Sequence, residues 1–544
     1  MIVSSATVEA GSHIAADLVI VGAGAVGITI AKRLSGTKLK VLLLESGGYE
    51  PDEATQALYE GVIAGQQTDP TDASRLRFFG GTTNHWAGWC RPLEESDFQK
   101  RADWPESGWP ITRADLDPYY RDAALLCQVI PAQFDDMGFW QRQKGGQILK
   151  PLALDAGKLR TTLIQCSPPT HFGEAYRADL EKAQNVRVLL NANVMELLPG
   201  TPGRKSKASK AVGKIVVRKQ DGKSFTVAGR AVVLAQGGIE SARLMLLSDK
   251  VHPSGAGNEN DMVGRYFMDH PLLSNASYVR FAQAGDSRPL YFKMPNKVGS
   301  GQVFGFLTPP PALLAKERIS AFRLIMRPSW TSTDGADSIR ALTDSLKHGR
   351  FPDHLGEHLG NIFSDIDVLA DSAYKTVTKS REGFLSEDKN KPARGAWVDL
   401  NFEQRPNRDS RVTLDSSRDA LGQRRLKLEW RLSETDRRTA MRALDIAAHE
   451  FSRAGLGRSR VRLDVSGSKP WPWEMRGSNH HSGTARMSAD PKTGVVDADC
   501  RVHTLDNLYV GGSAVFPTQG YMNPTLTIVA LAARLSDHLQ KVLA

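Results

Sequence analysis

A glycine-rich turn near the amino terminus constrains the fold of this chain more than any other feature. The apolar run Leu18–Val21 leads into Gly22-Ala23-Gly24-Ala25-Val26-Gly27, and the residues that follow have the spacing of a buried helix face. The first glycine allows a tight turn, the second lets backbone approach a pyrophosphate, and the third lets the helix pack on the strand. The helix amino terminus adds partial positive charge. This turn predicts a strand–turn–helix unit that binds a phosphate-bearing ligand through Gly22, Gly24 and Gly27.

A second strand follows at the spacing that a dinucleotide-binding unit requires. The run Lys40–Leu44 ends in Glu45, which is placed to accept a ribose hydroxyl, and Ser46 comes directly after it. NAD and FAD present the same ADP half to such a unit, so this part of the chain does not distinguish them. The front of the chain therefore predicts a dinucleotide-binding domain in which Glu45 and Ser46 contact the ligand.

The composition is that of an ordinary globular protein with room for two or more structural units. The chain has 544 residues, of which 41% are hydrophobic. No uninterrupted apolar run of about 18 residues occurs, so we expect no membrane span. Without a secretory signal the cytoplasm is the expected location, and a periplasmic one stays open if a leader was removed or a partner subunit carries the signal.

Cysteine spacing and charge argue against two further classes of protein. Cys90, Cys127, Cys166 and Cys500 form no Cys-x-x-Cys pair, so we expect neither a zinc site nor an iron–sulfur cluster. The net charge is +10, yet the basic residues carry no motif that reads a nucleic acid. We therefore expect no metal and no nucleic-acid partner.

Two further segments carry residues suited to redox chemistry. The first is the loop Phe79-Gly80-Gly81-Thr82-Thr83-Asn84-His85-Trp86-Ala87-Gly88, which can lie along a flat ring. The second is the tail, with His480-His481-Ser482-Gly483-Thr484 and then Gly520-Tyr521-Met522-Asn523-Pro524-Thr525. Oxidising an alcohol beside a flavin requires a base for the hydroxyl proton, which a histidine can be, and an amide donor can stabilise the oxygen. The helix that begins near Pro524 and Thr525 can direct its positive end at the reduced ring.

Together these segments resemble the glucose–methanol–choline (GMC) family of FAD-dependent oxidoreductases over nearly the whole chain. Within it they look like the pyranose oxidase-like and sugar dehydrogenase branch, where a G-G-x-x-x-H-W loop and an N-P-T-L-T segment recur, here Gly80–Trp86 and Asn523–Thr527. The family's H-x-x-G-T frame places the base at His480, with His481 the second candidate, and the oxygen donor at Asn523. The resemblance implies FAD contacts at these further positions: Gly80, Gly81, Thr82, Asn84, His85, Trp86, Ala87, Val194, Ala235, Gly512, Pro524 and Thr525.

The resemblance also implies a fold class and a domain order. We expect an α/β chain (α+β overall) whose Rossmann-like FAD-binding domain is interleaved with a mainly antiparallel substrate-binding sheet backed by helices. The FAD-binding domain would cover residues 14–271, with a substrate-domain contribution between about 90 and 160, and the substrate-binding domain 272–455. Residues 456–544 would return to the FAD-binding domain with the catalytic pair. The stretch from Pro328 to Pro392 is either a lid or interaction surface or an ordinary excursion with two short helices.

The expected reaction is oxidation of a secondary alcohol of a sugar or glycoside to a ketone, by hydride transfer to the flavin. A non-sugar primary alcohol or aldehyde is the alternative substrate, and a flavin-bearing lyase or a binding protein is a third reading. In pyranose oxidases the histidine matching His85 can be bonded to the flavin, whereas related sugar dehydrogenases hold it unlinked, so both states stay open. The electron acceptor is open between oxygen, a quinone and a cytochrome.

Overall fold

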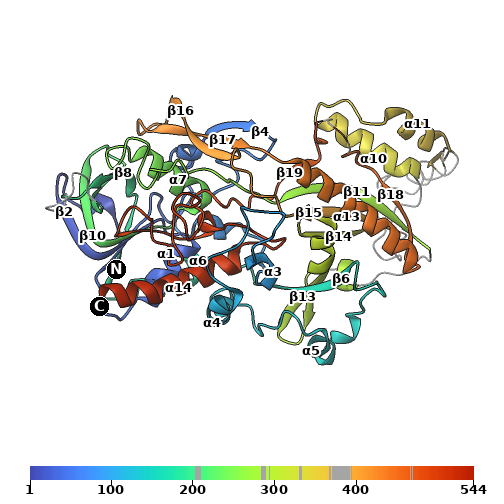
Figure 1. The fold of residues 1–544 in the computed structure, drawn as a ribbon, viewed down its shortest axis with the longest axis horizontal. Coiled ribbons are helices and arrows are strands. Elements are labelled where there is room, and N and C mark those ends of the chain that lie inside the picture. Colours follow the sequence, from blue (N-terminus) through green and yellow to red (C-terminus); the bar gives the residue numbers. More distant parts are fainter. Residues whose placement is uncertain are drawn as a thin grey trace.

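The computed structural model describes residues 1–201, 210–282, 289–292, 294–329, 334–364, 366, 369–370, 393, 395–465, 467 and 470–544. Two large sheets lie at opposite ends of the long axis of the molecule (Figure 1). The amino-terminal and carboxyl-terminal ends both lie beside the first sheet. No helix among these residues is long and apolar enough to cross a membrane.

The first sheet is built around the predicted strand–turn–helix unit. β2 (His13–Val21) leads through the glycine turn into α1 (Ala25–Arg33), and β3 (Val41–Leu44) returns parallel to β2. These bounds confirm the predicted elements. The strand order is β1-β7-β3-β2-β10-β9-β8, with β20 also paired to β10. The remaining strands are β1 (Ile2–Ser4), β7 (Val186–Leu190), β8 (Asn193–Pro199), β9 (Val212–Arg218), β10 (Ser224–Leu234) and β20 (Leu508–Val510).

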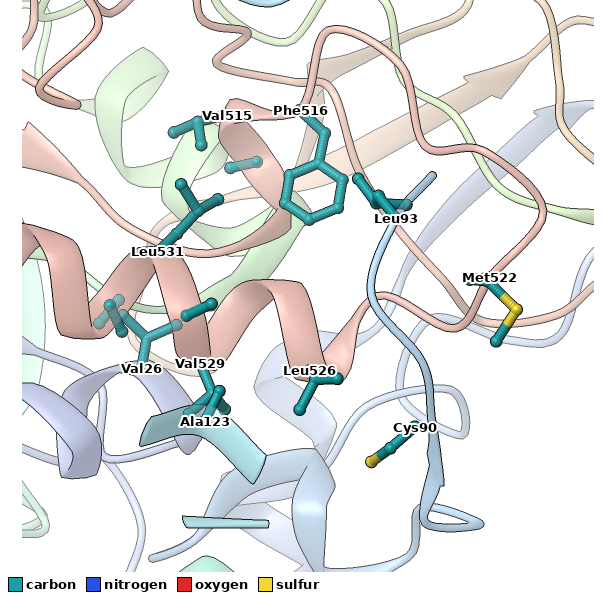
Figure 2. Close-up of a cluster of buried hydrophobic side chains, with 14 of the residues drawn as sticks. Val26, Cys90, Leu93, Ala123, Val515, Phe516, Met522, Leu526, Val529 and Leu531 are labelled. Carbon is teal, nitrogen blue, oxygen red and sulfur yellow. The ribbon is translucent and has the colours of Figure 1, made fainter. Parts of the chain in front are cut away.

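Helices distant in sequence cover this sheet. α14 (Thr525–Leu543) packs against α1 and α4 (Arg113–Leu126), while α6 (Phe172–Lys182) and α7 (Gly237–Leu247) complete the cover. Figure 2 shows where α1, α4 and α14 meet: Val26, Ala123 and Val529 lie in one buried apolar cluster. Burying a valine side chain contributes about 1.5–3 kcal/mol, and the smaller Ala123 contributes less. The tail is thus held against the front of the chain by an apolar core.

The second sheet is antiparallel and has the order β18-β11-β15-β14-β13-β6-β5, with β12 paired to β13 and β19 to β11. α13 (Glu434–Arg453) backs it and begins at Ser433 with the predicted cap, in which Asp436 accepts from the Ser433 N–H at 2.6 Å. Its strands are β5 (Trp89–Cys90), β6 (Arg160–Cys166), β11 (Pro271–Phe281), β12 (Asn296–Val298), β13 (Gly301–Thr308), β14 (Phe322–Ser329), β15 (Gly395–Phe402), β18 (Gly457–Val461) and β19 (Met475–Gly477).

One predicted strand lies outside this second sheet. Residues 426–430 fall in β17 (Arg424–Trp430), which pairs antiparallel with β16 (Arg411–Arg418) and parallel with β4 (Gly61–Gly65). The alternating pattern identifies a strand, but it does not identify the partner, and here the partner comes from the front of the chain.

The shorter helices lie in the connections. Between Pro328 and Pro392 the structure has α10 (Asp334–Lys347) and α11 (Leu355–Ser364), and most of residues 365–392 lie outside the described part of the chain, so the two readings of this stretch are not separated. The other short helices are α2 (Glu53–Gln56), α3 (Glu95–Phe98), α5 (Met137–Arg142), α8 (Pro289–Phe292) and α9 (Pro311–Glu317).

A buried ion cluster connects the sheet of β4, β16 and β17 to the first sheet. Glu240 on α7 accepts from Arg243 at 3.0 Å, from Arg75 at 3.2 Å and from Arg77 at 3.3 Å, and Arg243 also donates to Asp419 at 2.6 Å. Burial alone would raise the pKa of Glu240, but the guanidinium groups of Arg243, Arg77 and Arg75 lower it to about 2. Glu240 is therefore the carboxylate that all three arginines share, and Asp419 adds a second negative charge beside Arg243.

We predict that Glu240→Gln lowers the free energy of unfolding by about 3–5 kcal/mol, because it leaves buried guanidinium groups uncompensated. Since the folded pKa lies below the ordinary 4.5, the stability that Glu240 contributes is complete above pH 4.5 and is lost as the pH falls toward 2. Urea unfolding at pH 7 and pH 3 measures both effects. Glu181→Gln, which removes an exposed partner of Arg177, is the control, with an expected change below about 1 kcal/mol. Equal losses in the two variants would contradict the role of Glu240.

Candidate functional site

A cavity of about 790 Å³ extends from the glycine turn to the tail residues His480 and Asn523. Residues from both of the segments that the sequence singles out as redox-competent lie on its wall, and the loop that begins at Gly80 contacts the glycine turn directly. The predicted residues that line it are Gly22, Gly24, Glu45, Ser46, Gly81, Thr82, His85, Trp86, Ala87, Val194, Ala235, His480, His481, Gly512, Asn523, Pro524 and Thr525.

The three glycines of the turn meet three different surroundings. A Cβ on Gly22, whose φ is +103°, would lie 2.9 Å from the Ala235 carbonyl oxygen, and a Cβ on Gly27 would lie 2.0 Å from that of Gly22. A Cβ on Gly24 would meet nothing within 4 Å, because Gly24 faces the cavity at the start of α1. The turn is therefore closed where backbone packs on backbone and open where a pyrophosphate would approach, which fits a dinucleotide.

Glu45 lines the cavity and also accepts hydrogen bonds from the backbone of the glycine turn. Its Oε2 accepts from the Ala23 N–H at 2.8 Å, and its Oε1 accepts from the Gly47 N–H at 2.9 Å and lies 3.4 Å from the Ser46 hydroxyl. The acid at the end of β3 thus holds the backbone of both neighbouring turns. The sequence predicts the position of this acid, but not these internal bonds.

Three of the predicted contact residues are not on the cavity wall. Gly27 lies in the packed part of α1, Gly80 donates its N–H to the Ala23 carbonyl at 2.9 Å, and Asn84 donates to the Phe79 carbonyl at 3.0 Å. These residues shape the turn and the loop rather than face the cavity. His85, in the same loop, does line the cavity, as Ala87 does. Burial lowers the pKa of the His85 imidazole.

The catalytic candidates form a continuous set of hydrogen bonds. The Asn523 amide nitrogen lies 3.1 Å from His480 Nε2, and His480 Nδ1 lies 2.9 Å from His270 Nδ1. His270 Nε2 lies 2.8 Å from the Gly520 carbonyl oxygen, and the Arg323 guanidinium donates to Asn523 Oδ1 at 2.7 Å. The structure therefore brings His480 and Asn523 together as one unit and adds His270 and Arg323 to them.

The surroundings keep His480 neutral. Burial, and then the nearby His270, Arg323 and His481, hold the pKa of His480 well below its ordinary 6.5. Arg323 is 2% exposed, and burial lowers its pKa to about 9. Among the described residues Arg323 forms no ion pair with a carboxylate, so its positive charge acts on the imidazole beside it.

His481 has a different environment from His480. Its ring lies 5.7 Å from that of Phe267, and burial and the charge of Arg75 lower its pKa to about 3. Its side chain does not share in the hydrogen bonds of Asn523 and His270. The geometry thus separates the two adjacent histidines and favours His480 as the base.

Asp269 organises the backbone behind the pair. Its carboxylate accepts the N–H groups of His270 at 2.7 Å, His480 at 2.9 Å, Asn479 at 3.1 Å and Ser478 at 3.2 Å. Within the described part of the chain, Asp269, His270 and His480 bring potential ligand atoms within 4.8 Å of one another. These atoms are already engaged with N–H groups or with each other, so we assign no metal to them.

The wall opposite the glycine turn comes from the second sheet and carries several polar side chains beside the apolar Leu272 and Ile325. Arg323 and Arg327 come from β14, Asp399 and Asn401 from β15, and Ser478 from the segment before His480. Arg327 and Asp399 form an ion pair at 2.7 Å. Sequence reasoning missed these residues. Arg323, Arg327, Asp399 and Asn401 lie on ordinary strands, and His270 and Ser478 lie beside strand ends with no motif of their own; the only signal was polar residues on otherwise apolar strands.

Comparison with known proteins finds a family match and relatives that span nearly the whole chain. The family described as GMC oxidoreductase matches residues 406–532. The fructose dehydrogenase large subunit of Gluconobacter japonicus is 22% identical over 96% of this chain and 97% of that protein. The 6'''-hydroxyparomomycin C oxidase of Streptomyces lividus is 25% identical over 97% of this chain and 92% of that protein.

Among solved structures, the pyridoxine 4-oxidase from Mesorbium loti superposes with a TM-score of 0.51 and 17% identity, and covers 96% of this chain and 99% of that one. This likeness supports the fold, with its α/β first sheet and antiparallel second sheet. The matched tail, residues 406–532, and the two relatives thus make the chain similar to the GMC oxidoreductases, which supports an FAD-dependent oxidoreductase that acts on alcohol groups.

Proposed function

We propose that this protein oxidises a secondary alcohol of a sugar or glycoside to a ketone, with His480 as the base and Asn523 as the donor to the substrate oxygen. One observation supports this most strongly. His480 Nε2 and the Asn523 amide nitrogen lie 3.1 Å apart on the wall of the cavity that also contains the open face of Gly24. One hydroxyl group can contact both atoms beside a bound flavin.

FAD would lie along the cavity with its diphosphate at Gly24 and its ring toward His480. The turn around Gly22 and the start of α1 would hold the diphosphate, and Val194 and Ala235 would line the ADP end. The loop from Gly81 to Ala87, with Gly512, Pro524 and Thr525, would hold the flavin, whose chemistry is to accept a hydride from the alcohol carbon. α14 begins at Thr525 with no acidic residue in its first turn, so its positive end is free to stabilise negative charge.

The protein residues would handle the proton of the hydroxyl group. The neutral His480 can accept that proton, and the Asn523 N–H can stabilise the alkoxide character that develops on the oxygen. The uncompensated Arg323 behind Asn523 polarises the amide in the same direction. These are the two tasks that alcohol oxidation requires of the chain itself.

The polar side chains of the wall from the second sheet are suited to bind a polyhydroxylated substrate. Asn401, Ser478 and the Arg327–Asp399 pair offer both donors and acceptors to several hydroxyl groups. Two relatives whose names refer to fructose and to an aminoglycoside agree with this class. A panel of free sugars, glycosides and simple alcohols in anaerobic flavin reduction tests the proposal, and faster reduction by simple alcohols would favour the non-sugar alternative.

His85 is the residue through which a covalent bond to the flavin would form, because its imidazole lines the cavity within the loop and its lowered pKa keeps it neutral. Acid precipitation distinguishes the two states: a yellow pellet indicates a covalent bond, and a yellow supernatant indicates free FAD.

We predict that His480→Ala retains FAD and loses roughly 10²–10⁴-fold in the rate constant of flavin reduction by the best sugar, because the hydroxyl proton loses its acceptor. Stopped-flow absorbance of the flavin gives the rate, and the ratio of flavin to protein absorbance gives the FAD content. His481→Ala is the matched variant and should keep the rate within about tenfold. Rapid reduction in His480→Ala would reject the assignment, and a larger loss in His481→Ala would exchange the two roles.

We predict that Gly24→Val lowers the FAD content at least tenfold while the protein stays folded. The added side chain meets no protein atom at its Cβ and projects where the diphosphate would lie. Gly356→Ala, at a helix position that also has open space around an added Cβ but lies on α11 away from the cavity, is the control. Circular dichroism reports folding and absorbance reports FAD. A Gly24→Val protein with full FAD content would show that the diphosphate lies elsewhere.

A further inference from the structure

Four side chains at the site form a single chain of hydrogen bonds whose ends leave no choice of direction. In order, the chain runs from Arg323 to Asn523, His480 and His270, and ends on the Gly520 carbonyl. A guanidinium can only donate and a carbonyl can only accept. The position of each proton between these two ends can therefore be worked out.

The carbonyl end fixes the proton on His270. Because the Gly520 oxygen at 2.8 Å only accepts, His270 Nε2 must carry a hydrogen. Burial, and then the charge of Arg323, lower the pKa of His270 to about 3, so its ring is neutral and holds one hydrogen. Its Nδ1 is therefore an acceptor, directed at His480.

This acceptor fixes the tautomer of His480. The two Nδ1 atoms lie 2.9 Å apart, so the hydrogen between them must belong to His480. The neutral ring of His480 then has its lone pair on Nε2, the atom that lies nearest Asn523. The base is held with its accepting atom at the cavity.

The guanidinium end leads independently to the same arrangement. Arg323 donates to Asn523 at 2.7 Å, so the amide oxygen must face Arg323 and the amide nitrogen must face His480. The amide N–H then donates to Nε2 at 3.1 Å, which agrees with the lone pair that the carbonyl end requires. The hydrogen-bond directions worked out from the Gly520 end and from the Arg323 end therefore agree.

We propose that His270 and Arg323 are positioning residues that hold the His480 lone pair and the Asn523 N–H donor ready for one substrate hydroxyl. This inference rests on the proposed function. The hydroxyl would enter between the two atoms: its O–H bond breaks, an N–H bond forms at His480 Nε2, and Asn523 donates to the oxygen. A bound FAD would supply the acceptor for the C–H electron pair, which would leave as hydride, so that the alcohol would lose two electrons and become a ketone.

A neutral histidine behind His480 leaves the pKa of His480 low, whereas an acidic residue there would raise it. A carboxylate at that position would raise the pKa of His480 and favour its protonated form, which cannot accept a proton. The groups that face the imidazole are His270, which directly precedes β11, Arg323 from β14 and the adjacent His481. Asp269, whose pKa burial raises to about 7, bonds to the backbone N–H of His480 and not to its ring.

The first test compares His270→Leu with His270→Asp in the FAD-loaded enzyme. His270→Leu removes the acceptor, so we expect the rate constant of flavin reduction to fall about tenfold to a hundredfold, with FAD content and sugar Kd within about twofold. His270→Asp restores an acceptor but adds charge, so its pH profile should show the loss of activity on the acid side at least one pH unit higher than in the wild type. Asp269 is present in every variant, so its titration does not produce this difference. A wild-type rate in His270→Leu, or an unmoved profile in His270→Asp, would overturn the role of His270.

The second test is a pair of double-mutant cycles, which do not depend on the stability of any one variant. If His270 acts only through His480, then adding His270→Leu to His480→Ala should cost no further rate; likewise, adding Arg323→Met to Asn523→Ala should cost none. Additive losses in both cycles would overturn the inference. Spectra of ¹⁵N-histidine-labelled holoenzyme give a readout other than activity, since His480 should show a hydrogen on Nδ1 that is lost from that position in His270→Leu.

Failure of this inference can be distinguished from failure of the proposed function. If His480→Ala still reduces its flavin rapidly, the proposed function is wrong. If His480→Ala is slow but His270→Leu and Arg323→Met both retain the wild-type rate, only the positioning roles are wrong.

Discussion

The close approach of the tail to the start of α7 is the contact on which the site depends. A Cβ on Gly238 would lie 2.4 Å from the His481 carbonyl oxygen, so only glycine lets the segment that carries His480 lie against the first sheet. The Ser513 hydroxyl donates to the same carbonyl at 2.6 Å and fixes the segment from the other side. The catalytic candidates are more than 200 residues from α7 in the chain, yet they share its backbone surface. The position of His480 is thus set by backbone packing on α7 together with the bonds that Asp269, next to β11, accepts from the same segment.

The second constraint is electrostatic and comes from the opposite wall. Arg323 projects from β14 into the same region with no carboxylate beside it among the described residues, whereas the buried arginines Arg75, Arg77 and Arg243 share Glu240. A buried cation without a counter-charge costs free energy, which Arg323 offsets in part through its bond to Asn523 and its contacts with the rings of Phe306 and Trp89. Such a cation disfavours protonated histidine nearby and favours negative character on a substrate oxygen. Burial of the Arg323 charge thus destabilises the fold at the place where that charge would favour alcohol oxidation.

The sequence predicts the first sheet well because its signals are local. The glycine turn and the run that ends in Glu45 depend on residues within a few positions, and so does the cap of α13 behind the second sheet; each has the predicted place in the structure. The pairing of β17 with β4 and the approach of His270 to His480 were not predicted, because both join residues far apart in the chain and neither leaves a pattern in its own segment. The candidate pair His480 and Asn523 could be named from motifs, but the residues that orient them could not.

The difference between naming a base and orienting it has a physical origin. A motif identifies an imidazole, which has two nitrogens that are chemically similar, and only the surroundings decide which one holds the lone pair. Here that decision comes from a carbonyl at Gly520, in the turn before α14, and a guanidinium at Arg323, on β14, which stand at opposite ends of the chain of hydrogen bonds. Gly520 is three residues before Asn523, so the turn that presents the amide also supplies the acceptor that ends the chain of hydrogen bonds. Any change that moves this turn should therefore alter the amide and the imidazole together, because one backbone segment sets the orientation of both.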